Sequence, residues 1–94
     1  MKTYQLFCGR NMPNGGYVTL GAFKAFTQEH VNPLFMGYTV SDVQGVWKGI
    51  PEKTKCISIC TDREQDVLAV AKAYKKLFNQ DSVAIQQLAP MSFV

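Results

Sequence analysis

The sequence predicts an α+β fold of the ferredoxin-like type, in which a four-stranded antiparallel sheet carries two helices on one face. Two observations lead to this prediction. The expected elements follow the order β-α-β-β-α-β, and both helical segments repeat apolar residues at helical spacing. With 94 residues, 47% of them hydrophobic, the chain is long enough for one such core, so we expect a single domain over residues 1–94.

The N-terminal part is expected to supply the first strand and the first helix. Residues 4–8 are bulky and partly aromatic, which favours a strand. Residues 9–16 are dense in turn formers and predict a plain connecting loop, with an anion cradle around Arg10 as the alternative. Thr19 is expected to cap a helix that ends at residues 32–33. Its apolar face is expected to comprise Leu20, Phe23, Phe26 or Thr27, His30 and Val31.

Two further strands are expected in the middle of the chain. Residues 38–47 are rich in β-branched and aromatic residues and predict a strand, but neither of its faces is cleanly apolar. This pattern suits a sheet edge or an interface. Residues 49–51 are expected to turn the chain into a third strand at residues 55–60.

The second helix is the clearest element of the sequence. Residues 61–62 are expected to cap it, and Lys72, Lys75 and Lys76 are expected to face water. Its apolar positions are Val67, Val70, Ala71, Tyr74, Leu77 and Phe78. Residues 82–88 predict the fourth strand. The apolar tail, residues 91–94, is expected to join a sheet edge or a neighbouring subunit.

Composition and charge argue against several classes of protein. The formal net charge of +3 is mild, and the third strand lacks the aromatic pattern of RNA-binding sheets, so nucleic-acid binding is not expected. No apolar segment approaches the roughly 20 residues that span a bilayer, and the N-terminus does not resemble a signal peptide. We therefore expect a cytoplasmic protein that binds no membrane.

The cysteine and histidine residues indicate no disulfide framework, metal or cofactor. Cys8 is remote in sequence from the other two cysteines, and Cys56 and Cys60 would lie about 13 Å apart on one strand, too far for a disulfide bond or a shared metal. All three are expected to be buried thiols. His30 is the single histidine, and no motif spacing supports a metal site or catalytic triad around it.

The stretch at residues 45–54 concentrates chemistry that packing does not require. It places Trp47 and Glu52 around the tip of a predicted hairpin. One interpretation is that they form a site; the alternative is that Trp47 covers the core and Glu52 is a solvated turn residue. The sheet face opposite the helices would carry Cys56, Ser58 and Cys60, which suit packing against another subunit. We therefore expect an oligomer, with a trimer as one closed solution.

Several short motifs in residues 38–88 resemble the phage-encoded S-adenosylmethionine lyases (SAM lyases). Gly45-x-Trp47 falls where those enzymes carry Gly-x-Tyr. The other matching features are Glu52-Lys53-Thr54 at the start of a strand, a helix with Val67, Ala69 and Ala71, and Gln80-Asp81-Ser82-Val83 before the last strand. The sequence also resembles a group of short bacterial proteins of unknown function, and the loop at residues 9–16 is closer to that group.

The resemblance to the lyases implies a homotrimer with sites between subunits, which splits S-adenosylmethionine into 5′-methylthioadenosine and homoserine lactone. Glu52 would carry the essential carboxylate that holds the substrate ammonium. Trp47 would replace the family's tyrosine and present an aromatic face to the sulfonium. Asp81, with Gln80 and Ser82, would reach the ribose or adenine from the adjacent subunit.

The sequence leaves other functions open beside this enzyme. Arg10 is a further candidate for substrate binding. If the chain is phage-borne, depletion of the methyl donor in the host cytoplasm would counter restriction-modification. One alternative is a non-catalytic trimer that sequesters S-adenosylmethionine or an adenine nucleotide. Another is a trimer that only scaffolds a further protein.

Overall fold

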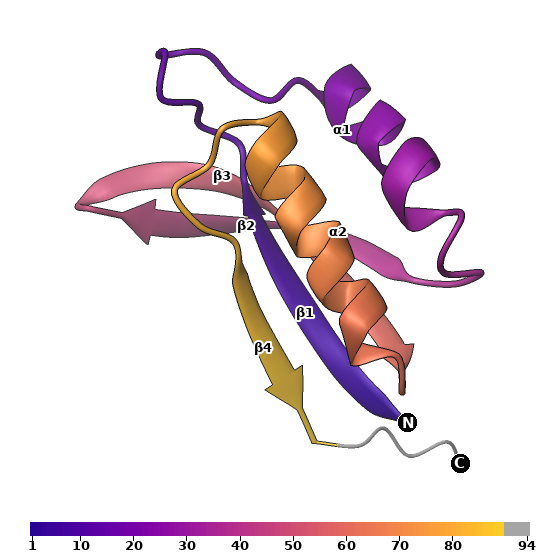
Figure 1. Cartoon of the computed structure of the whole chain (residues 1–94). Coiled ribbons are helices and arrows are strands. Elements are labelled where there is room, and N and C mark those ends of the chain that lie inside the picture. The colour runs from indigo at the N-terminus through magenta and orange to yellow at the C-terminus, as the bar shows by residue number, and fades with distance from the viewer. Residues whose placement is uncertain (90–94) are drawn as a thin grey trace.

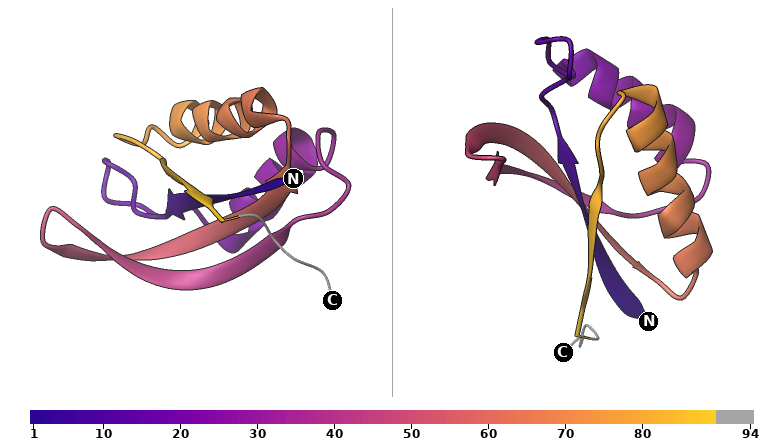
Figure 2. Two further views of the ribbon diagram at one scale, coloured as in Figure 1. Left: turned by 90° about the horizontal axis from the view of Figure 1, so that it is seen from below. Right: turned by 60° about the vertical axis from the view of Figure 1, so that its left-hand side comes forward.

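The computed structural model describes residues 1–89 and confirms the predicted fold class. Four strands form one antiparallel sheet in the order β2-β3-β1-β4, and both helices cover the same face of it (Figures 1 and 2). The elements are β1 (Lys2–Gly9), α1 (Leu20–Phe26), the π-helical turn η1 (Thr27–Val31), β2 (Thr39–Trp47), β3 (Ile50–Thr61), α2 (Glu64–Leu77) and β4 (Ala84–Leu88). The expected role of residues 91–94 lies outside the described residues.

The hydrophobic core fills the space between the sheet and the two helices. The central strand β1 contributes alternate residues, Tyr4, Leu6 and Cys8, all of them buried. Ile57 and Ile59 of β3 are fully buried in the same cluster, which confirms that they face the helices. Because alternate residues of a strand point to opposite faces, the residues between these positions lie on the open face of the sheet.

The first helix begins and ends close to the predicted residues, but its second half is a π-helical turn. The Thr19 hydroxyl accepts a hydrogen bond from the backbone N–H of Ala22 at 3.0 Å, so Thr19 is the N-cap as expected. The α-helix ends at Phe26 and continues as the π-helical turn η1 to Val31. The expectation that Leu20 belongs to the apolar face is wrong, because Leu20 lies in the first turn and is 61% exposed.

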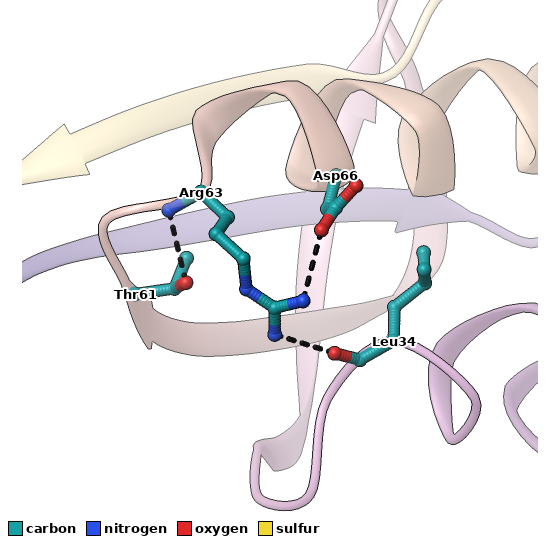
Figure 3. Close-up of polar contacts among 4 residues, drawn as sticks. All are labelled: Leu34, Thr61, Arg63 and Asp66. Atoms are coloured by element: carbon teal, nitrogen blue, oxygen red, sulfur yellow. Dashed lines mark hydrogen bonds and ion pairs between the residues drawn. The ribbon is translucent and has the colours of Figure 1, made fainter.

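The second helix begins with a cap that differs from the expected one. The Thr61 hydroxyl accepts a hydrogen bond from the Arg63 N–H, but the N-cap is Arg63 itself, and Asp62 is exposed (Figure 3). The Arg63 guanidinium binds Asp66 in the first turn and donates to the Leu34 carbonyl. This arginine therefore ties the start of α2 to the segment that follows η1.

The exposed face of α2 is wider than predicted at its C-terminal end. The four residues Val67, Val70, Ala71 and Tyr74 are buried as expected. Leu77 is 55% exposed, so its assignment to the core is wrong, since it lies in the last turn where the core ends. The three expected surface lysines are exposed.

A long hairpin formed by β2 and β3 extends beyond the helices (Figures 1 and 2). Its turn consists of Lys48 and Gly49, both with positive φ, and the expectation of a turn at residues 49–51 is wrong because Pro51 already belongs to β3. The pairing of β1 with β3 ends at Thr54. Pro51 therefore lies where β3 is an edge strand on that side, and an edge tolerates the missing N–H of proline.

β2 is exposed on both faces along its whole length. Only Gly45 in this strand is partly buried. Its pairing with β3 places Val43 opposite Thr54 on the open face and Asp42 opposite Lys55 on the helix-covered face. The predicted edge character of this strand is therefore confirmed. The exposed large apolar residues of β2, together with Ile50 at the start of β3, are Val40, Val43, Val46, Trp47 and Ile50.

Candidate functional site

A cavity of about 600 Å³ lies on the open face of the sheet, near the β2–β3 hairpin. Phe7 alternates with the core residues of β1 and is paired with Ala84 of β4, and both line the cavity. Val43 and Thr54, a pair between β2 and β3, complete the floor. The volume falls within the range of about 300–1,000 Å³ that is usual for small-molecule sites.

Five of the six predicted site residues line this one cavity. They come from three parts of the chain: the end of β2, the first half of β3, and the loop between α2 and β4. The residues are Trp47, Glu52, Gln80, Asp81 and Ser82. The fold thus brings together residues that are as far apart in the sequence as Trp47 and Ser82.

Glu52 is held in a defined position on β3. Its carboxylate accepts a hydrogen bond from the backbone N–H of Asn11, with 3.0 Å between nitrogen and Oε2. It also lies against Gly9, because a Cβ atom at residue 9 would lie 2.6 Å from the carboxylate carbon and from both oxygens. Glu52 is partly buried in a strand, so the alternative of a solvated turn residue is wrong.

Trp47 ends β2 and presents its ring at the edge of the cavity. The residue is 50% exposed and is not part of the buried core, so the alternative in which it covers the core is wrong. The ammonium nitrogen of Lys48 lies 5.9 Å from the ring centroid. A cation can therefore reach the face of this indole.

The loop after α2 also lines the cavity. Asn79 ends the helix with a positive φ of 52°, a conformation that asparagine tolerates, and the Gln80 N–H donates back to the Lys75 carbonyl. This turn aims Asp81 toward the hairpin, where its carboxylate lies 3.6 Å from the ammonium of Lys48. Ser82 follows on the same loop and is exposed.

The amide group of Gln80 is engaged within the protein. Its Nε2 donates to the carbonyl of Asn11 at 2.9 Å and to the carbonyl of Phe78 at 3.2 Å. The side chain therefore connects the loop after α2 with the loop after β1. Only its amide oxygen is left for a ligand by these contacts.

Arg10 is the one predicted site residue that does not line this cavity. Its Nε donates to the carbonyl of Val18 at 2.8 Å, which holds the side chain on its own loop. It borders a second hollow of about 830 Å³, beside Pro51 and Lys53. Glu52 borders both hollows, so Arg10 is a neighbour of the candidate site and not a member of it.

The sequence analysis assigned no role at the site to Gly9, Asn11 or Tyr74. The Tyr74 hydroxyl donates to the Gly9 carbonyl at 2.6 Å, although the side chain belongs to the helix layer. Burial, with Cys8 and Glu52 nearby, raises the pKa of Tyr74 above its ordinary value of 10.0. A signal was available, because a phenol in the apolar stripe of a helix usually requires a buried acceptor.

Both charged residues that line the cavity are acidic, and the Lys48 ammonium lies beside one of them, Asp81. Within residues 1–89, the charged side chains that line it are Glu52 and Asp81. No group of three or more His, Cys, Asp and Glu in that range is arranged to hold a metal ion, and all three cysteines are free. None of the described helices is long and apolar enough to cross a membrane.

Comparison with known proteins supports the fold and identifies the family. A solved structure of a phage SAM lyase in the apo state superposes with a TM-score of 0.70 at 18% identity, over 93% of this chain and 78% of that one. At this identity the likeness shows the fold alone. No curated protein matches the chain. Residues 3–93 match the sequence profile described as "Protein of unknown function (DUF3574)". The chain belongs to the DUF3574 family.

Proposed function

We propose that this protein is a SAM lyase that converts S-adenosylmethionine to 5′-methylthioadenosine and homoserine lactone. One observation carries the proposal: an indole and two carboxylates, those of Glu52 and Asp81, meet in one cavity. Both charged lining residues are acidic although the whole chain has a formal net charge of +3, and Lys48 pairs with Asp81 alone. This local reversal of sign favours a cationic ligand that has an aromatic or apolar part.

S-adenosylmethionine has the chemistry that such a cavity would bind. Its ammonium group suits the Glu52 carboxylate, which has no ion-pair partner within the described part of the chain. Its sulfonium suits the exposed face of Trp47, for a cation–π contribution of about 0.5–2 kcal/mol. Its ribose hydroxyls suit Asp81 and Ser82, which line the same cavity.

The proposed reaction needs positioning more than it needs acid or base catalysis. A carboxylate oxygen of the substrate attacks its own Cγ, and the Cγ–S bond breaks with both electrons going to sulfur. The positive charge of the sulfonium is cancelled, and neutral 5′-methylthioadenosine leaves as the lactone ring closes. The task of the protein is then to fold the methionine part into the attack geometry and to keep water out.

We propose further that a homotrimer completes the site. The cavity is bounded on one side by β2, whose exposed apolar residues would be covered by a second subunit. The second subunit would close the cavity over a substrate held by Glu52 and Asp81, which line it from one chain. Sedimentation should give three times the chain mass of 10.5 kDa. A monomer at micromolar concentration would contradict this part of the proposal.

The direct test of the activity is incubation with S-adenosylmethionine and detection of methylthioadenosine by mass spectrometry. Glu52→Gln should lower the rate by roughly 10- to 100-fold, because it removes a charged hydrogen-bond acceptor worth about 1.5–3 kcal/mol. Glu29→Gln is the matched control, since Glu29 is exposed on η1. Absence of product from the unaltered protein would refute the enzyme.

The second candidate function is a module that binds S-adenosylmethionine or an adenine nucleotide without turnover. It is favoured by Trp47, which offers an aromatic face but no phenol oxygen for a hydrogen bond that the lyases' tyrosine could make. A thermal-shift titration that stabilises the protein while the ligand stays intact would support this function. If Trp47→Tyr then created lyase activity, the indole would be the reason that the unaltered protein has none.

A further inference from the structure

The Glu52 carboxylate is held by backbone atoms of a distant loop. Residues 9–11 pass directly over it: Gly9 leaves room for the carboxylate, and the Asn11 N–H donates to Oε2 at 3.0 Å. Within residues 1–89 no side chain donates a hydrogen bond to Oε1. This leaves one carboxylate oxygen fixed and the other available to a ligand.

The backbone carbonyls of the first and last of these residues, Gly9 and Asn11, accept hydrogen bonds from other elements. The Gly9 carbonyl accepts from the Tyr74 hydroxyl at 2.6 Å, and the Asn11 carbonyl accepts from Gln80 Nε2 at 2.9 Å. Between them, the Arg10 N–H donates to the Lys53 carbonyl at 3.0 Å. Residues 9–11 are therefore anchored to α2, to the loop after α2, and to β3.

We propose that residues 9–11 act as a clamp that sets the position of the Glu52 carboxylate, and that Tyr74 and Gln80 are positioning residues that act through this clamp. Gly9 permits this position, because a Cβ there would lie 2.6 Å from the carboxylate and would displace it. The proposal rests on the proposed function, since it assigns to Glu52 the task of holding the substrate ammonium. It reassigns Gln80 from contact with substrate to support of the clamp.

The aromatic core makes Tyr74 a rigid anchor. Its ring is fully buried and packs edge-on against Phe26, with a second contact to Phe78 at 4.8 Å between ring centroids. A ring held on several sides fixes its hydroxyl, and that hydroxyl fixes the Gly9 carbonyl at the end of β1. The packing of the helix layer thereby determines the geometry of a carboxylate on the opposite face of the sheet.

The first test compares Gly9→Ala with Gly21→Ala. A Cβ at Gly9 would lie 2.6 Å from the carboxylate, whereas a Cβ at Gly21 would approach no closer than 4.0 Å to the Thr19 hydroxyl. Hydrogen exchange of the Asn11 amide is measured by NMR on the ligand-free protein. We expect exchange at least about tenfold faster in Gly9→Ala and unchanged in Gly21→Ala, since the hydrogen bond to a charged group is lost.

The second test removes single donors and keeps the shape of the side chain. Tyr74→Phe and Gln80→Met should each speed Asn11 exchange by roughly 2- to 10-fold, the equivalent of one neutral hydrogen bond. Tyr38→Phe is the matched control, because Tyr38 donates a hydrogen bond of the same 2.6 Å length to Asn32, away from the site. If Gly9→Ala fails to fold, the rate of Asn11 exchange in Tyr74→Phe decides whether the clamp exists.

Binding of S-adenosylmethionine, measured by calorimetry, connects the clamp to function. The dissociation constant should rise by roughly tenfold in Gly9→Ala and should not change in Gly21→Ala or Tyr38→Phe. Unchanged Asn11 exchange in both Gly9→Ala and Tyr74→Phe would overturn the clamp, whatever the protein binds. Failure of the unaltered protein to bind would refute the proposed function alone, because the exchange experiment contains no ligand.

Discussion

The helix-covered core and the β2–β3 hairpin belong to one sheet but are stabilised in different ways. On β1, Tyr4, Leu6 and Cys8 alternate with less buried residues, and their side chains fill the core. On β2 every residue but Gly45 is exposed, so the strand is held by backbone pairing with β3. The side chains of β2 therefore do not pack into the core. Trp47 is one of them, which is why the candidate site is found here.

The largest expected effect comes from the same valine-to-alanine substitution made once in the core and once on the hairpin. Val67→Ala removes two methylene equivalents from a fully buried position and should lower the free energy of unfolding by about 2–3 kcal/mol. Val46→Ala, at a residue that is 68% exposed, should change it by less than about 0.5 kcal/mol. Urea denaturation measures both. Equal losses would mean that the hairpin packs on something within the same chain.

An effect of intermediate size is expected at alkaline pH, where the buried Cys8 thiol of the core should lower the free energy of unfolding. Burial, with a smaller contribution from Cys56, raises the pKa of the Cys8 thiol from 9.0 to about 12. Between these values the unfolded chain loses a proton that the folded chain keeps, so stability falls as pH rises, by up to about 1.4 kcal/mol per pH unit. Unfolding free energies measured from pH 8 upward should fall less steeply in Cys8→Ala. Parallel curves would contradict the burial of this thiol.

The smallest expected effect lies at the hairpin tip. Lys48 and Asp81 form an ion pair of 3.6 Å between two exposed side chains, which typically contributes 0–1 kcal/mol. Lys48→Ala should therefore leave the melting temperature almost unchanged, and any loss should vanish at high salt. Thermal scans at low and high salt measure this. A loss of several kcal/mol would show that the ion pair anchors the hairpin.

Much of the fold could be predicted because it depends on neighbours in sequence. Thr19 caps its helix because its hydroxyl reaches an amide three residues later. The buried face of α2 follows from apolar spacing, which confirms Val67 and Tyr74. The errors occur where an element meets the rest of the molecule: Leu77 projects past the core, and Pro51 is tolerated in β3 because β1 has already ended.

The candidate site was predicted in part, through motifs rather than geometry. Trp47, Glu52 and Asp81 were each identified from short sequence patterns, and the structure places all three around one cavity. Arg10 was included because it lies in a glycine-rich loop, but its guanidinium is bound to Val18 of that loop. A spacing pattern indicates which residues carry chemistry. It does not indicate which way a loop turns them.

By itself the sequence determined the order of the elements, the cap at Thr19 and most of the buried face of α2, since these depend on residues within a few positions of one another. Tertiary structure alone decided that Gly9 lies over Glu52 and that the Tyr74 hydroxyl reaches the Gly9 carbonyl. Those contacts join segments that meet only when β1, β3 and α2 have packed. Their formation depends on the closure of the whole core, and no local pattern contains it.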